Sequence, residues 1–178
     1  MWRPGFGHIE RQPALLRGAH RSLCVYSIVH RGCKQRPGLV LGLDAGGSCR
    51  GIAFRVGSAT IETTLRYLRA REQVTNVYRE TKRPVELLDG SCRKVKAVCF
   101  LVDRLHPQYA GRLTIDRQAE LVHAGRGESG PNVEYVANTL RHLDEMGLKE
   151  SKLRQLMARL DHDAATASGL PDGLRAQG

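Results

Sequence analysis

Glu72 is the residue whose type and place in the chain most strongly suggest chemistry. It closes residues 64–72, a segment in which Leu65 and Leu68 recur at helical spacing among charged side chains. That pattern predicts an amphipathic helix. A carboxylate at a helix C-terminus lies at the negative end of the helix dipole, and partial desolvation there would raise its pKa and suit it to general-base chemistry. Position alone leaves an alternative, a solvated helix-end glutamate with no chemical role.

The elements that must position Glu72 indicate an α+β fold, because strand-like segments come first and helices follow. The strand-like segments are residues 39–43, 49–56, 84–88 and 93–102, with a turn predicted at 44–48 and a hairpin at Asp89-Gly90. Ser58 is a candidate N-cap for the helix that carries Glu72. The later helices are predicted at residues 114–124, 132–146 and 148–160, with Thr114 and Asn132 as N-caps and Gly147 as a C-cap. We expect one domain over residues 1–160 and a flexible C-terminal tail over 161–178.

Composition narrows the function classes. The chain has 178 residues, which is long enough for a hydrophobic core. Its formal net charge of +10 raises nucleic-acid binding as a rival interpretation. Aromatic residues make up only 5%, and no helix-turn-helix, RNP-type or zinc-finger pattern is present, so we expect no nucleic-acid partner. No apolar run approaches the length of a membrane span, and the beginning has no secretory pattern, so we expect no membrane partner. Five cysteines without metal-ligand spacing suggest reduced thiols in a cytoplasmic protein with no metal site.

Several motifs occur in one order along the chain. They are Trp-Arg-Pro-Gly-Phe at residues 2–6, His-Arg-Gly at 30–32, Arg-Pro-Gly-Leu-Val-Leu-Gly-Leu at 36–43, Gly-Ile-Ala-Phe-Arg at 51–55, His-Pro-Gln-Tyr-Ala-Gly at 106–111 and Ser-Gly-Pro-Asn-Val-Glu-Tyr at 129–135. This series resembles the ChaC family of glutathione-specific γ-glutamylcyclotransferases over residues 1–160. The resemblance implies a small mixed β-barrel flanked by helices. It also implies that Glu72, in Tyr-Leu-x-x-Arg-Glu, is the catalytic base.

The chemistry that the resemblance implies uses no water, metal, cofactor or covalent intermediate. The α-amine of glutathione attacks its own γ-glutamyl carbonyl, and 5-oxoproline and cysteinylglycine are released. The substrate-binding candidates are Tyr135, which resembles a substrate-binding tyrosine of the family, Tyr78 and Tyr109 as weaker candidates, and Arg31, which could face a substrate carboxylate. A structural salt bridge is an equal alternative for Arg31, and packing in the core is the alternative for the tyrosines. The oligomeric state is left open.

The chain departs from the family pattern at its beginning. Members open with a strand that leads into Tyr-Gly-Ser-Leu, a loop whose backbone N–H groups hold the γ-glutamyl group, and that motif is absent from residues 1–178. Either the natural start lies upstream, or the chain lacks part of its substrate cradle. We expect this 178-residue form to be weakly active or inactive, and less stable. Two rival functions therefore stay open. One is a catalytically impaired binding protein, and the other is a cyclotransferase acting on other γ-glutamyl amines.

Overall fold

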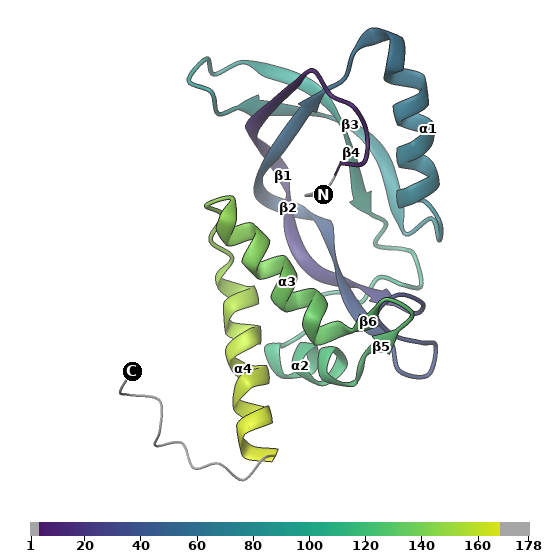
Figure 1. Ribbon diagram of the computed structural model, residues 1–178, viewed down its shortest axis with the longest axis vertical. Coiled ribbons are helices and arrows are strands. Elements are labelled where there is room, and N and C mark those ends of the chain that lie inside the picture. The colour runs from purple at the N-terminus through teal and green to yellow at the C-terminus, as the bar shows by residue number, and fades with distance from the viewer. Residues whose placement is uncertain (1–3, 168–178) are drawn as a thin grey trace. The chain divides into compact units, whose positions relative to one another are not determined.

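The computed structural model describes residues 4–167 of the chain (Figure 1). These residues form two compact units. Residues 4–25 and 41–111 form the barrel unit, and residues 26–40 and 112–167 form the helical unit. The single domain expected over residues 1–160 stays a prediction.

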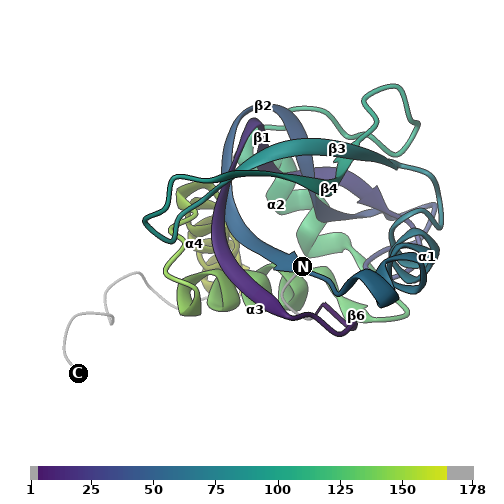
Figure 2. The same cartoon turned by 90° about the horizontal axis from the view of Figure 1, so that it is seen from above.

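The barrel unit is built on four strands that close into a barrel in the order β1-β2-β4-β3. Figure 2 shows these strands from above. Their bounds are β1 Glu10–Ser27, β2 Gly38–Arg55, β3 Tyr78–Leu87 and β4 Lys94–Val102, and the ends of β1 and β2 that enclose residues 26–40 belong to the helical unit. β3 pairs with β1 and β4 in antiparallel fashion, whereas β2 and β4 run parallel with Leu43 opposite Leu101. The prediction of a small mixed β-barrel flanked by helices is confirmed.

The core of the barrel contains side chains from each of its four strands. Because successive strand residues point to opposite faces, the inward positions of all four strands supply one apolar cluster. Its buried members are Ala14, Leu16, Ala19, Cys49, Val85, Leu87 and Leu101. The hairpin predicted at Asp89-Gly90 is confirmed, since β3 and β4 pair from Tyr78 opposite Val102 to Glu86 opposite Lys94.

The predicted turn at residues 44–48 is wrong. β2 continues through this segment as one strand, which bends where Gly46 and Gly47 have φ angles of +96° and +69°. Glycine adopts these angles without the penalty that a Cβ would cause, so polar turn residues and a continuous strand are compatible here. Asp44 is buried within the strand and is not part of an exposed loop.

The helix that carries Glu72 forms as predicted. α1 spans Ile61–Glu72, and the short 3-10 turn η1, Ser58–Thr60, precedes it. Thr64 and Leu68 are its buried residues, one turn apart on one face. The predicted N-cap at Ser58 is wrong, because Thr60 holds the N-cap position and makes no side-chain capping bond.

The helical unit consists of α2 Ile115–Ala124, α3 Asn132–Glu145 and α4 Ser151–Ala167, which pack together, and the two-residue strands β5 Arg126–Gly127 and β6 Gly130–Pro131. The N-cap at Thr114 is confirmed, because its side chain accepts a hydrogen bond from the Arg117 N–H. The predicted C-cap at Gly147 is one residue off, because Met146 holds the C-cap position of α3. Gly147 follows it with φ +69°, and its N–H bonds to the Asp144 carbonyl at 2.8 Å. The predicted end of the last helix at residue 160 is wrong. α4 continues to Ala167 through alanine-rich sequence that favours helix, and residues 168–178 of the predicted tail lie outside the described residues.

Candidate functional site

Glu72 is the last residue of α1, as the sequence pattern predicts. Its side chain is 22% exposed, and its Oε1 lies 3.1 Å from the Nε of Arg71. The carboxylate is therefore held in an ion pair while part of it still reaches solvent. A group that must exchange protons with a small substrate needs both an orientation and access.

Arg71 in turn is fixed by the segment near the beginning of the described chain. Its Nη1 donates to the Pro4 carbonyl at 3.1 Å and to the Tyr67 hydroxyl at 3.3 Å. Gly5 has φ +71°, and a Cβ there would lie 2.1 Å from the Tyr67 hydroxyl oxygen. Only glycine allows this approach. Residues 4–6 therefore help to fix the guanidinium that pairs with Glu72.

A second contact ties the last turn of α1 to the barrel. Arg69 donates from Nε and Nη2 to the two carboxylate oxygens of Glu80 on β3, at 2.7 and 3.1 Å. Paired parallel hydrogen bonds of this kind fix an orientation as well as a distance. The hydrogen bond from Arg69 holds the pKa of Glu80 below its ordinary value. No local sequence pattern identifies this pair, because its members lie 11 residues apart on different elements.

Tyr78 is joined to Glu72 by the short turn between α1 and β3. The turn includes Asn76 with φ +59°, a conformation that asparagine tolerates better than most residues. Gln73 donates from Nε2 to the Tyr78 carbonyl at 3.4 Å, and the Tyr78 hydroxyl lies 3.0 Å from the Leu41 carbonyl oxygen, to which it donates. Because a main-chain carbonyl can only accept, this bond uses the phenolic proton of Tyr78.

Tyr109 belongs to a charge network around the buried carboxylate of Asp44, which was not among the predicted site residues. Its hydroxyl donates to Asp44 Oδ2 at 3.0 Å, while Asp44 Oδ1 accepts from Arg104 Nε at 2.7 Å and from the Ala45 N–H at 2.8 Å. Asp44 is 1% exposed and Arg104 is 46% exposed. Arg104 also lies over the Tyr109 ring, 6.0 Å from its centroid. Both oxygens of a buried carboxylate are thus satisfied.

The contacts in this network shift the pKa values of Asp44 and Tyr109. Burial alone would raise the pKa of Asp44, but the hydrogen bonds from Arg104, the Ala45 N–H and Tyr109 outweigh it and hold that pKa below its ordinary value. Burial, followed by the bond to Asp44, raises the pKa of Tyr109. Nearby, burial and then the charge of Asp44 raise the pKa of the Cys24 thiol to about 12.

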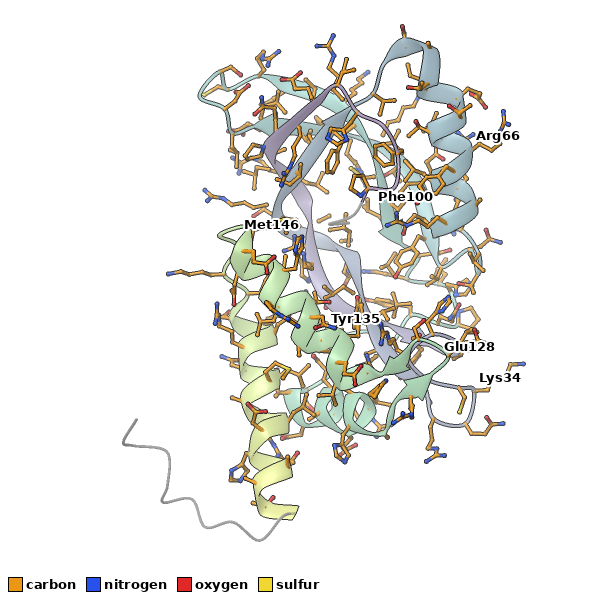
Figure 3. All side chains as sticks on the ribbon, in the orientation of Figure 1. Lys34, Arg66, Phe100, Glu128, Tyr135 and Met146 are labelled. Atoms are coloured by element: carbon orange, nitrogen blue, oxygen red, sulfur yellow. The ribbon has the colours of Figure 1, made fainter. Side chains whose placement is uncertain are left out.

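Arg31 and Tyr135 are brought together in the helical unit. The Arg31 guanidinium carbon lies 5.5 Å from the centroid of the Tyr135 ring, a cation–π distance. Figure 3 labels Tyr135 on α3. Arg31 Nη1 also donates to the carbonyls of Ser129 and Pro131, at 2.5 and 3.3 Å. Both acceptors are neutral main-chain carbonyls, so neither of these two bonds is the salt bridge considered for Arg31.

The predicted site residues thus fall into two groups. Glu72, Tyr78 and Tyr109 belong to the barrel unit, and Arg31 and Tyr135 belong to the helical unit. Asn132 was predicted as an N-cap, but Pro131 holds that position and Asn132 is the first residue of α3. The fully buried side chain of Asn132 instead bonds to the main chain of Leu39. One signal for Asp44 existed in the sequence, namely a single charged residue directly after the apolar run at 39–43.

Among residues 4–167 there is no group of three or more His, Cys, Asp or Glu side chains placed to hold a metal ion. Within the same described part of the chain, no helix has the length and apolar character needed to cross a membrane.

Comparison with known proteins gives consistent results. The protein of Escherichia coli K12 named glutathione-specific gamma-glutamylcyclotransferase is 32% identical over 174 residues, which cover 98% of this chain and 74% of that relative. The human protein named glutathione-specific gamma-glutamylcyclotransferase 1 is 31% identical over 150 residues, which cover 83% of this chain and 66% of the human one. This chain therefore spans only part of the length of these relatives.

Among solved structures, the yeast γ-glutamyl cyclotransferase specific to glutathione aligns with a TM-score of 0.78 at 19% identity, covering 90% of this chain and 93% of the yeast chain. At that identity the likeness supports the fold alone. The family model described as ChaC-like protein matches residues 1–163. From that match and the 32% identity to the bacterial relative, the chain belongs to the ChaC-like protein family.

Proposed function

We propose that this chain degrades glutathione by intramolecular γ-glutamyl cyclotransfer. The α-amine nitrogen forms a bond to the γ-glutamyl carbonyl carbon, the bond to the cysteine nitrogen breaks, and 5-oxoproline and cysteinylglycine are released. No water is consumed. The names of the bacterial and human relatives support glutathione as the substrate.

Glu72 is the proposed general acid and base. It accepts a proton from the attacking amine and returns one to the departing nitrogen, so that the carboxylate is regenerated in each turnover. The observation that carries this assignment is the position of Glu72 at the end of α1, in an ion pair with Arg71 and partly exposed. The Arg69–Glu80 pair supports it by fixing the last turn of the helix to β3.

Arg31, Tyr78, Tyr109 and Tyr135 are the proposed substrate-binding residues. Arg31 is suited to a carboxylate of glutathione, because a guanidinium presents several donors in one plane. Tyr78 and Tyr109 donate their protons to Leu41 and Asp44, so toward a substrate each can act as an acceptor for an N–H group. The cytoplasmic location and the absence of nucleic-acid and membrane partners stay predictions.

The experiment is the release of 5-oxoproline and cysteinylglycine from reduced glutathione, measured for the purified chain and its Glu72→Gln variant. We expect Glu72→Gln to lower kcat by about a hundredfold or more, the usual contribution of a general base. Glu62→Gln is the matched control, because Glu62 is an exposed carboxylate in the first turn of the same helix. Folded wild-type protein that releases neither product would refute the proposal and favour the binding-protein alternative. Release of products from other γ-glutamyl amines alone would favour the other rival.

A further inference from the structure

Asn132 makes an unusual pair of contacts for a helix residue. Its side chain is fully buried, and its Oδ1 accepts from the Leu39 N–H at 2.6 Å while its Nδ2 donates to the Leu39 carbonyl at 2.8 Å. One side chain thus satisfies both main-chain groups of a buried residue. This pairing fixes the first turn of α3 to the start of β2 in a single register, because neither buried group has water as an alternative.

Two glycines pack so closely against this pair that a side chain at either position would collide with it or with the Arg31 main chain. A Cβ at Gly38 would lie 2.1 Å from the Arg31 carbonyl oxygen and 2.7 Å from Asn132 Oδ1. A Cβ at Gly125 would lie 2.7 Å from the same Arg31 oxygen and 3.0 Å from Asn132 Cβ. The main chain of Arg31 is therefore packed directly against the glycines that surround Asn132.

The side chain of Arg31 points to the same helix start. Its Nη1 donates to the carbonyl of Pro131, the residue before Asn132, and its guanidinium lies over Tyr135, one turn further along α3. Arg31 thus contacts the start of α3 with its guanidinium, and its main chain packs against Gly38 and Gly125. A shift of α3 relative to Leu39 would change the placement of the guanidinium against the ring.

We propose that Asn132 is a positioning residue for substrate binding, which acts by holding Arg31 and Tyr135 in register through its two hydrogen bonds to Leu39. The inference rests on the proposed function, because the substrate-binding roles of Arg31 and Tyr135 belong to it. Asn132 itself takes no part in proton transfer.

The test compares Asn132→Ala and Asn132→Asp with Leu156→Ala in steady-state glutathione cleavage, below the unfolding temperature of every variant. Asn132→Asp keeps the size and one acceptor but, when ionised, cannot donate to the Leu39 carbonyl. Leu156 is fully buried on α4 of the same unit, and the two hydrogen bonds to Leu39 come from Asn132. Truncation of Leu156 therefore destabilises the unit while the donors and acceptors of both bonds stay in place. We expect both Asn132 variants to raise KM about tenfold with kcat within about threefold. That is the size expected when one charge-assisted contact to the substrate is lost. Leu156→Ala should leave KM within about twofold.

A second measurement does not depend on glutathione. Amide hydrogen exchange of Leu39 should be faster in Asn132→Ala than in Leu156→Ala of similar thermal midpoint. Equal KM values for the Asn132 variants and wild type, or equal KM increases in Leu156→Ala, would overturn the positioning role. Wild-type protein without glutathione cleavage but with the expected exchange pattern would instead refute the proposed function and leave the structural part of the inference standing.

Discussion

Replacing Asp44 should destabilise the barrel unit by an amount that the geometry predicts. Asp44→Ala removes the acceptor of the Ala45 N–H, the Tyr109 hydroxyl and Arg104. Arg104 is 46% exposed and can be hydrated instead, so its loss costs little. Ala45 is also an exposed residue, so its N–H can be hydrated at small cost, whereas the half-buried Tyr109 hydroxyl loses its buried partner at about 1–2 kcal/mol. The expected loss in the free energy of unfolding is therefore about 1–3 kcal/mol.

The contribution of the Asp44 carboxylate to the free energy of unfolding should depend on pH. The direction of this dependence follows from the lowered pKa of Asp44 in the folded state. A carboxyl with a lowered folded pKa contributes stability above its unfolded pKa of about 4 and loses that contribution as pH falls through the folded pKa. Asp44→Asn keeps the shape but not the charge. The stability difference between wild type and Asp44→Asn should therefore be largest near neutral pH and shrink below about pH 4.

The assay is urea unfolding followed by circular dichroism at several values between pH 7 and pH 3, with the slope against urea checked for constancy. Asp161→Asn, an exposed carboxylate on α4, is the control and should change stability by less than about 0.5 kcal/mol. A double-mutant cycle of Asp44→Ala with Tyr109→Phe should give a coupling energy of about 1–2 kcal/mol. An Asp44→Asn variant as stable as wild type at pH 7, or a difference that stays constant to pH 3, would refute the reasoning.

Two further predictions concern the site and its surroundings. Gly5→Ala should lower the free energy of unfolding by about 1–3 kcal/mol, because φ is +71° and the new Cβ would lie 2.1 Å from the Tyr67 hydroxyl. Gly51→Ala, where no atom lies within 4 Å of the new Cβ, should be near neutral in the same urea assay, and equal effects would contradict the steric explanation. With iodoacetamide at pH 8 and peptide mass spectrometry, Cys24 should react at least about a hundredfold more slowly than the exposed Cys92, since a pKa of about 12 leaves very little thiolate. Similar rates in the folded chain would show that Cys24 is not shielded as described.

The catalytic candidate is positioned by contacts of different strength. The Arg69–Glu80 pair has ideal paired geometry but is 46% and 21% exposed, so it fixes orientation more than it adds stability. The contact of Gly5 with Tyr67 is steric and allows one residue type only. Residues 4–6 therefore help to position Glu72 through Arg71, although they lie far from Glu72 in the sequence.

Local sequence determined the elements whose signals lie within a few residues. The helical spacing of residues 64–72, the Asp89-Gly90 hairpin and the N-cap Thr114 each depend on neighbours along the chain, and all are present in the structure. Glu72 could be placed at a helix end for the same reason. The assignment of its chemistry came from the family resemblance and not from the spacing.

Only the tertiary structure decided which distant groups meet. Asn132 bonds to Leu39 across 93 residues, and Arg104 bonds to Asp44 across 60. Neither pair has a local signature, because asparagine and aspartate are residue types that also occur in caps and turns. The continuity of β2 through residues 44–48 likewise depends on pairing with other strands. Periodicity reports which face of an element is apolar, whereas the partners of a buried polar group are set by chain segments that fold together from far apart.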